Sequence, residues 1–229
     1  MSEFDQHAST YASAVNDSIA FSGLKVDTFV RAKAFHLRRM FQANGIDPAD
    51  RIVDVGCGIG TYEIELSDHW SNMVGIDVSE RSIAQARLNC AKAEFLGFEG
   101  KTMPFASQSV AAVFAICVWH HVPLEDWTLF LSEIRRILRP GGIVAVFEHN
   151  PWNPLTRWAV ERCVFDKDAV LLSLPTAREL LCEAGFSISK CAYILSIPAT
   201  GGILGRVDGW LAPLPTGAQY MVLARKETE

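Results

Sequence analysis

A glycine-rich segment, Asp54–Gly60 (DVGCGIG), is the part of the chain whose residue types and spacing point most directly to chemistry. It follows the short apolar run Arg51–Val55, which we predict to be a strand, and it leads into a stretch of helical periodicity. Gly56, Gly58 and Gly60 stand at alternate positions, and glycine lets a loop turn tightly against a ligand because it accepts positive φ and has no side chain. The first turn of the next helix would offer N–H groups to a polar ligand. The segment therefore predicts a nucleotide-type binding loop.

The spacing of these glycines favours one class of nucleotide over another. Nicotinamide dinucleotide sites usually read G-x-G-x-x-G, whereas this loop reads G-x-G-x-G and has Asp54 two residues before its first glycine. A carboxylate at that point attracts a bound cation and repels a pyrophosphate. We therefore expect an adenosyl ligand that bears an ammonium group and a sulfonium. Asp77, at the end of the next predicted strand, is expected to accept hydrogen bonds from both ribose hydroxyls, although taken alone it is equally an ordinary charge beside a helix N-terminus.

Two histidines follow the continuous apolar run Val110–Cys117, which we predict to be a strand buried on both faces. The sequence there is Trp119-His120-His121, and it would lie at the mouth of the site, where Trp119 is a candidate to contact the substrate. Histidine titrates near neutral pH, so His121 or His120 is a candidate to orient a substrate or to accept its proton. The structural alternative is a histidine that bonds to a loop carbonyl.

A second polar loop, Glu148–Pro154 (EHNPWNP), follows the predicted strand Ile143–Phe147. Its His149, Asn150 and Trp152 suit contact with a small-molecule substrate. A proline-stiffened loop with capping asparagines is the alternative that the residues leave open.

The elements that must position these residues alternate between strands and helices. Besides those already named, strands are expected at Met73–Ile76, Ala93–Phe98, Phe186–Ile197 and Ala218–Ala224, and helices at Tyr62–His69, Ser79–Lys92, Glu125–Leu138 and a segment with a Thr176–Glu179 capping box that Gly185 closes. This alternation predicts a parallel α/β sheet with right-handed crossovers, whose ligands bind beyond the carboxyl ends of the strands. Every candidate residue above follows a strand, as that rule requires.

Composition and charge narrow the class of protein. The chain has 229 residues, 49% hydrophobic and 21% charged, which suits one domain with a full core. Its net charge of −5 disfavours a nucleic-acid partner. The six cysteines form no C-x-x-C pair, so we expect reduced thiols in a cytoplasmic protein and no metal site. No signal peptide and no apolar run of about 18 residues is visible, so no membrane span is expected.

Several of these motifs, in order along the chain, together resemble the class I S-adenosylmethionine (SAM) dependent methyltransferases, and most closely the small ubiquinone/menaquinone-type branch. The motifs are Asp54–Gly60, Val74–Ser79, Met103-Pro104-Phe105, His121 and Pro140-Gly141-Gly142. The resemblance covers Asp50 to Gly142 well and the later strands more loosely. It implies an α/β, Rossmann-like, doubly wound and mostly parallel seven-stranded sheet, with an N-terminal helical lid over residues 1–45 and a SAM-binding domain over residues 46–229.

The resemblance also implies roles at matching positions. SAM would be held by Asp54, Gly56, Cys57, Gly58, Gly60, Asp77, Val78, Glu99, Gly100, Ile116 and Cys117. Asp54 would lie near the amino group, Val78 beside the adenine, and Glu99, which replaces the usual aspartate, near the adenine amino group. Tyr11 belongs to a segment that often covers the site in relatives, where it would reach the SAM carboxylate or simply pack within its helix.

The leading hypothesis is methyl transfer from SAM to a small-molecule substrate whose acceptor atom, oxygen, nitrogen or carbon, stays open. Cyclisation of SAM itself, with methylthioadenosine as product, and a non-catalytic SAM-binding regulator are the alternatives. The segment from Leu155 to Leu174 would line an acceptor pocket, the core or a dimer contact. The chain would be a monomer or a homodimer.

Overall fold

The computed structural model describes residues 26–166, 169–197 and 202–227. Tyr11 and residues 1–25 of the predicted N-terminal helical lid lie outside the described residues. Helix α2 (Val26–Ala43) lies within that predicted segment, and Gly45, which follows it, has a φ of 67°. Positive φ is the conformation that a glycine allows at a helix end, so Gly45 suits the end of α2.

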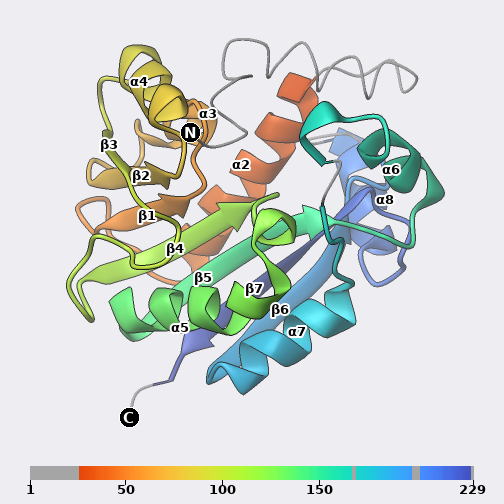
Figure 1. Cartoon of the computed structure of the whole chain (residues 1–229). Coiled ribbons are helices and arrows are strands. Elements are labelled where there is room, and N and C mark those ends of the chain that lie inside the picture. Colours follow the sequence, from red (N-terminus) through yellow and green to blue (C-terminus); the bar gives the residue numbers. More distant parts are fainter. Residues whose placement is uncertain (1–25, 167–168, 198–201, 228–229) are drawn as a thin grey trace.

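A seven-stranded sheet forms the centre of the molecule, in the order β3-β2-β1-β4-β5-β7-β6 (Figure 1). Its strands are β1 (Ile52–Val55), β2 (Met73–Asp77), β3 (Glu94–Gly97), β4 (Val110–Ile116), β5 (Leu138–His149), β6 (Phe186–Ile194) and β7 (Gln219–Lys226). The first five strands pair in parallel, whereas β7 pairs antiparallel with both β5 and β6. The mostly parallel seven-stranded sheet predicted from the sequence is therefore confirmed.

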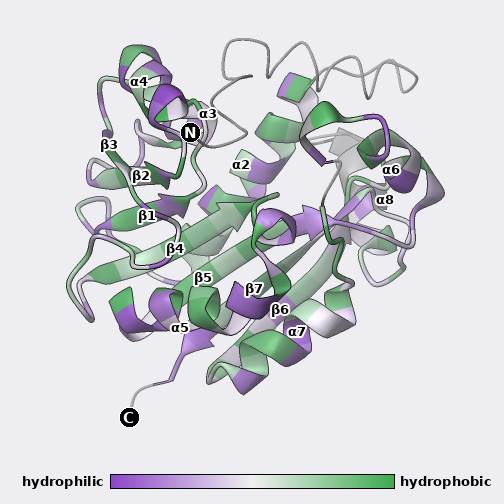
Figure 2. Cartoon of the chain, in the orientation of Figure 1, coloured by the Kyte–Doolittle hydropathy of each residue, from purple (hydrophilic) through white to green (hydrophobic). Residues whose placement is uncertain are grey.

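Helices cover both faces of this sheet, so the core has two layers. The helices after α2 are α3 (Thr61–Leu66), α4 (Glu80–Asn89), α5 (Trp127–Ile137), α6 (Pro154–Val160), α7 (Leu174–Glu183) and α8 (Gly202–Leu211). Residues of α5 and α7 pack with one face of the strands, and residues of α2 pack with the other. The strands are hydrophobic along most of their length, and the colour of β5 changes to hydrophilic at its carboxyl end (Figure 2). None of the helices within the described ranges is long and apolar enough to cross a membrane.

Two boundaries differ from the sequence prediction. The cap of α7 is Ser173, whose Oγ accepts a hydrogen bond from Thr176 N at 3.3 Å, so the predicted Thr176–Glu179 capping box is wrong. Pro175 lies in the first turn, where its fixed φ favours an earlier helix start. Strand β5 also begins at Leu138, which pairs with Val110, instead of after the Pro-Gly-Gly segment.

Helices α6 and α8 were not predicted. Helix α6 begins at Asn153, in agreement with the alternative of a loop with capping asparagines: Oδ1 of Asn153 accepts hydrogen bonds from Leu155 N at 3.0 Å and Thr156 N at 3.1 Å. Asn153 also donates from Nδ2 to Thr216 O at 2.8 Å, which ties the start of α6 to the segment before β7. The helix therefore begins at a fixed point beyond the end of β5.

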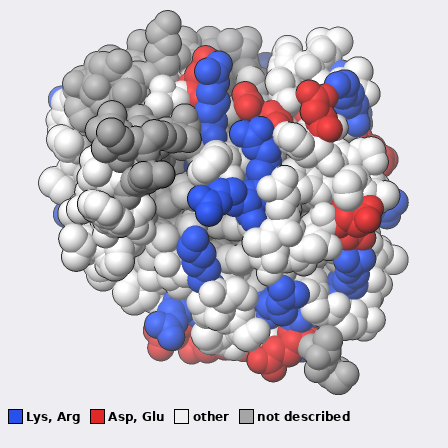
Figure 3. Space-filling view, turned by 180° about the vertical axis from the view of Figure 1, so that it is seen from behind, with Lys and Arg blue, Asp and Glu red and all other residues white. Residues whose placement is uncertain are grey.

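Seen from behind, Lys and Arg side chains form a column down the middle of the molecule, with Asp and Glu beside it (Figure 3). The expectation that the chain binds no nucleic acid stays a prediction.

Candidate active site

The glycine loop lies beyond the carboxyl end of β1 and is tied to the neighbouring strand. The N–H groups of Gly56 and Cys57 both donate to Ile76 O of β2, at 2.7 and 3.1 Å. Gly56 has a φ of 78°, and a Cβ there would lie 2.3 Å from Cγ2 of Val118. Gly58 also has positive φ, at 54°, but a Cβ there would meet no atom within 4 Å. Gly56 is therefore required for packing, whereas Gly58 leaves open space above the loop.

Asp77 joins this loop to the helix that follows β2. Its Oδ2 accepts a hydrogen bond from Gly58 N at 2.9 Å, and its Oδ1 accepts one from Ser79 N at 2.8 Å. Ser79 in turn caps α4 by accepting from Ser82 N at 3.1 Å. The carboxylate is thus held at the carboxyl edge of the sheet, against the glycine loop, as the sequence predicts. A carboxylate oxygen can accept from more than one donor, so this geometry is compatible with ribose hydroxyls.

A pair of buried carboxyl groups lies beneath the loop. Asp54 of β1 is 2% exposed, and Glu63 of α3 is fully buried. Among the described residues, no third group donates a hydrogen bond to Oδ2 of Asp54 or to either oxygen of Glu63, and the two carboxyls are close enough to share a proton. Burial, and then the charge of Glu63, raises the pKa of Asp54 well above its usual value. Burial raises the pKa of Glu63 to about 7. The pair therefore holds a proton near neutral pH, and a bound cation would compensate its second charge.

Glu63 was not singled out from the sequence. A side chain at Gly75 of β2 would come within 2.8 Å of Oε1 of Glu63, so the missing Cβ makes the room that this carboxyl fills. The only sequence signal is the spacing of Glu63 three residues before the buried Leu66, which places an acid on the inward face of α3. That signal would not have been specific without the contact to Gly75.

The other predicted cofactor residues surround the same edge. Val78 is 42% exposed, and a Cβ at Gly100 would lie 3.4 Å from its Cγ1, so Val78 and the loop that carries Glu99 are neighbours. Ile116 ends β4, and Cys117 follows with a φ of 56° and donates from its N–H to Phe147 O at 2.8 Å. Cys57 is 5% exposed. The roles of these residues toward SAM stay predictions.

A second group of polar side chains lies where β4 and β5 end. Nδ1 of His120 is 2.5 Å from Oε2 of Glu148, and both side chains are buried. Oε1 of Glu148 accepts hydrogen bonds from Val118 N at 3.1 Å and Trp119 N at 2.8 Å. Glu148, the penultimate residue of β5, therefore fastens the turn after β4 and orients the ring of His120.

Asp166 approaches the two histidines from the short 3-10 helix Val164–Asp166. Its Oδ1 is 3.5 Å from Nε2 of His120 and 3.4 Å from Nε2 of His121. The segment is attached to the same turn, because Val170 N donates to His120 O at 2.9 Å. Asp166 lies in the segment from Leu155 to Leu174 that the sequence assigns to an acceptor pocket, the core or a dimer contact, but no local sequence pattern indicates its contact with the histidines.

The charges of this group follow from its geometry. Burial alone would lower the pKa of His120, but Glu148 and Asp166 outweigh it and raise that pKa well above its usual value. Burial would raise the pKa of Glu148, and His120 instead lowers it. Burial, followed by the charge of His120, lowers the pKa of His149 to about 4. His121 has a side chain that is 21% exposed, so of the two predicted histidines it is the one that a substrate can reach.

Two of the predicted substrate contacts, Trp119 and Asn150, are buried side chains that contact other parts of the protein. Trp119 is fully buried, and its ring lies 5.8 Å from that of Trp127, centroid to centroid, so it belongs to the core beneath the site. Asn150 is also buried and donates from Nδ2 to Pro215 O at 3.0 Å and Gly217 O at 2.8 Å. Asn150 therefore holds its own loop in place through hydrogen bonds, which agrees with the alternative interpretation of a loop with structural asparagines.

The other two predicted substrate contacts stay predictions. His149 is close to Gln219, with 3.5 Å between Nδ1 and Nε2, and Trp152 is 54% exposed.

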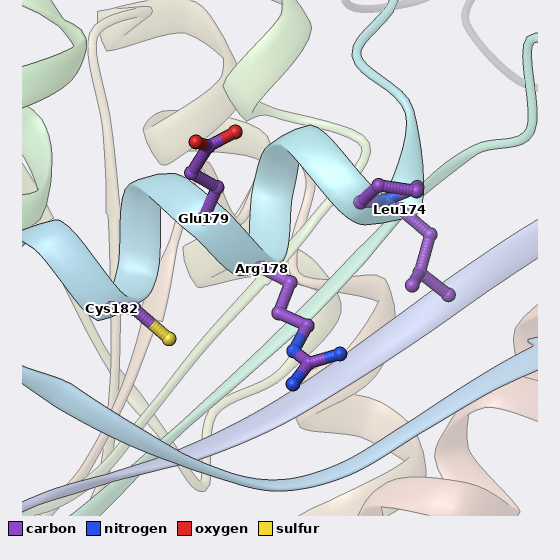
Figure 4. Close-up of a pocket in the computed structure, with 5 residues that line it drawn as sticks. Leu174, Arg178, Glu179 and Cys182 are labelled. Carbon is purple, nitrogen blue, oxygen red and sulfur yellow. The ribbon is translucent and has the colours of Figure 1, made fainter.

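A shallow hollow elsewhere on the surface is lined by residues of α7 alone (Figure 4). Arg178 and Glu179 project from different sides of that helix in this view. The hollow contains none of the residues that the sequence singled out for chemistry, so it is separate from the site at the carboxyl edge.

Comparison with known proteins agrees with this geometry. Residues 53–146 match the family described as methyltransferase domain. The chain therefore contains a domain of the class I SAM-dependent methyltransferase type. SAM is the methyl donor of this family. The matched residues include the glycine loop, Asp77 and both histidines.

The relatives act on different acceptors, according to their names. The chain is 33% identical over 129 residues to sterol 24-C-methyltransferase ERG6B of Gibberella zeae, and this match covers 53% of this chain and 33% of that protein. It is 29% identical over 198 residues to 2-methyl-6-phytyl-1,4-hydroquinone methyltransferase of Synechocystis, covering 81% and 58%. The chain thus spans only part of the length of these curated relatives.

Among solved structures, the methyltransferase of a Haloferax volcanii complex with the Trm112 methyltransferase activator matches with a TM-score of 0.68. It is 20% identical, and the match covers 100% of this chain and 99% of that one. At this identity the likeness shows the fold alone.

Proposed function

We propose that this methyltransferase transfers the methyl group of SAM to a small-molecule acceptor that binds beside His121. The observation that carries the proposal is the arrangement of two groups along one edge of the sheet. The buried pair Asp54 and Glu63 lies with Asp77 at the ends of β1 and β2, and the His120–Glu148 pair lies at the ends of β4 and β5. The first group offers charge to a cationic ligand, and the second faces an acceptor.

Asp54, Glu63 and Asp77 would hold the donor. SAM supplies a methyl group that is already activated on a sulfonium, so the protein has to align the acceptor and exclude water. The carboxyl oxygens of Asp54 and Glu63 that accept no hydrogen bond from a third group fit an ammonium group, because a buried acceptor without a donor is costly. Asp77, fixed by Gly58 N and Ser79 N, would accept hydrogen bonds from the ribose hydroxyls.

His121 and its neighbours would hold the acceptor. Glu148 fixes His120 through Nδ1 and fixes the turn through two N–H groups, so the position of His121 is determined before a ligand binds. Preorganisation of this kind lowers the entropy that alignment would otherwise cost.

The acceptor is expected to have an apolar part. Exposed hydrophobic side chains gather in the segment that follows β5 and contains Asp166: they are Trp152, Leu155, Trp158, Val164 and Val170. Apolar walls with a few placed polar groups are usual for small-molecule pockets. The sterol and hydroquinone named for the relatives are acceptors of this type, which supports the proposal without naming the substrate of this chain.

The proposal is tested by incubating the purified chain with SAM that carries ¹³C in its methyl group, alone and with a metabolite extract. Products are identified by mass spectrometry. The proposal predicts S-adenosylhomocysteine and a ¹³C-labelled metabolite only when the extract is present. Methylthioadenosine in the absence of extract would make SAM the substrate of a cyclisation. Tight binding of SAM without turnover in any extract would favour a regulator.

A further inference from the structure

Three side chains at the acceptor side converge on one point. They are His120 and His121, from the turn after β4, and Asp166, from the 3-10 helix after α6, and we name them the His–His–Asp triad. One potential ligand atom from each residue lies within 4.8 Å of those of the other two. Oδ1 of Asp166 lies 3.5 Å from Nε2 of His120 and 3.4 Å from Nε2 of His121. No local sequence pattern placed Asp166 there, because 44 residues separate it from the nearer histidine in the chain.

His120 supplies the most informative atom of this group. Its Nε2 is buried and has no hydrogen-bond partner among the described residues. The nearest carboxylate oxygen, Oδ1 of Asp166, is 3.5 Å away, which is too far for a good hydrogen bond. The imidazole of His120, a residue that is 1% exposed, is therefore aimed at two other ligand atoms with only a long ion-pair contact to Asp166, and an ion bound between the three atoms would replace the proton of that contact.

Glu148 has the relation to His120 that a carboxylate has to a metal-binding histidine. It holds Nδ1 at 2.5 Å, and this contact fixes the ring so that Nε2 points toward Asp166 and His121. Metal-binding histidines almost always engage a carboxylate or carbonyl through their other ring nitrogen. Two carboxylates, Glu148 and Asp166, therefore flank a single buried imidazole, and their charge is offset either by a proton on that imidazole or by a bound cation.

The spacing of the triad fits a tetrahedral ion. With bonds of about 2.0–2.1 Å, the ligand atoms of a tetrahedral Zn²⁺ lie roughly 3.3–3.4 Å apart. The two measured edges, from Oδ1 of Asp166 to the two Nε2 atoms, are 3.5 and 3.4 Å. The two histidines each have a potential ligand atom within 4.8 Å of the other, and the side chain of His121, which is 21% exposed, can adjust its position toward the ion.

We propose that His120, His121 and Asp166 bind a divalent transition-metal ion, with Zn²⁺ as the probe, and leave its fourth position open. Two histidines and one carboxylate with an open position are typical of catalytic metal sites. An acceptor hydroxyl at that position would be polarised and would lose its proton to solvent, so that its oxygen is ready for methylation. That last role rests on the proposed function, whereas binding of the metal does not.

The test measures Zn²⁺ binding directly. The full chain is purified with a tag that contains no histidine, treated with a chelator, desalted and titrated with Zn²⁺ by calorimetry, with Co²⁺ absorption spectra as a second readout. All proteins carry Cys182→Ser, because Cys182 is the exposed thiol among the described residues. The variants are Asp166→Asn and His121→Ala, and the matched control is His69→Ala, an exposed histidine in the turn after α3 whose Nε2 lies 3.4 Å from Arg38.

The proposal predicts one Zn²⁺ per chain, an affinity at least about 100-fold weaker in Asp166→Asn and His121→Ala, and no change in His69→Ala. Binding of Co²⁺ should give the visible absorption of a tetrahedral ion in the control and not in the two variants. Equal Zn²⁺ affinity in all three proteins, or no Zn²⁺ uptake by the control, would overturn it.

Titration of the same proteins with SAM shows whether the variants are folded and separates the two proposals. A chain that binds Zn²⁺ through the triad but does not bind SAM would retain the metal site and lose the proposed function. A chain that binds SAM but no Zn²⁺ would be consistent with the proposed function and would overturn the metal site.

Discussion

Replacing Glu63 by glutamine should remove most of the pH dependence of SAM binding between pH 6 and pH 8. Glu63 has a pKa of about 7 because it is buried, and it lies in a coupled pair with Asp54. A cationic ligand favours the ionised form of the pair, so binding requires loss of the proton.

The size of the effect follows from that pKa. With a value of about 7, the ionised fraction falls from roughly nine tenths at pH 8 to roughly one tenth at pH 6. The affinity of the natural chain for SAM should therefore be about tenfold weaker at pH 6, or about 1.4 kcal/mol. Glu63→Gln removes the carboxyl whose pKa is about 7, together with the charge that adds to burial in raising the pKa of Asp54. The affinity should therefore change by less than about twofold over the same range.

The assay is calorimetric titration with SAM at pH 6, 7 and 8. Glu65→Gln, two residues further along α3, is the matched control, and it should retain the tenfold change. The reasoning is refuted if Glu63→Gln keeps the full pH dependence or if the natural chain shows none.

Stability gives an independent check on the same carboxyl. The pKa of Glu63 is raised from 4.5 when unfolded to about 7 when folded, so the folded state keeps a proton that the unfolded state has released. Its contribution to stability is therefore lost as pH rises from about 4.5 to 7. Thermal unfolding should show that Glu63→Gln, relative to the natural chain, gains stability between pH 5 and pH 8, by up to about 3 kcal/mol. An unchanged difference would mean that the carboxyl is not buried as described.

Two further predictions concern packing at the site. Gly56→Ala should lower the free energy of unfolding by at least about 2 kcal/mol, because the new Cβ would meet Val118. Gly58→Ala should lower it by only the roughly 1 kcal/mol of backbone strain, because no atom lies near its Cβ. Urea unfolding compares the two variants, and equal losses would contradict the contact with Val118. Trp119→Ala should cost about 3–5 kcal/mol of stability, because the side chain is fully buried. Trp152→Ala, at an exposed residue, should cost less than about 0.5 kcal/mol and should raise the KM of the acceptor. The reverse order in thermal unfolding would place Trp119 at the surface.

The sheet and the donor side of the site were predictable because both follow from local patterns. Asp54, Asp77 and the glycine loop each stand at the end of an apolar run, and strands of a parallel sheet bring their carboxyl ends to one edge. The position of Asp77 beside Gly58 N confirms that reasoning in the structure.

The acceptor side was predicted less well because its contacts join distant segments. Trp119 was expected at the pocket mouth, but the turn after β4 points it into the core against Trp127. Asn150 was expected to contact substrate, but it satisfies two carbonyls of the segment before β7. Asp166 meets His120 only because its segment returns across the sheet edge, and no periodicity or motif encodes that return.

The most direct test of the account is calorimetric titration of the natural chain and of Asp77→Asn with SAM, with NAD as the competing ligand. Asp77 accepts hydrogen bonds through both oxygens, and asparagine can accept through only one. The account predicts that the natural chain binds SAM and not NAD, and that Asp77→Asn binds SAM at least about tenfold more weakly. Equal SAM affinity in both proteins, or binding of NAD in place of SAM, would contradict it.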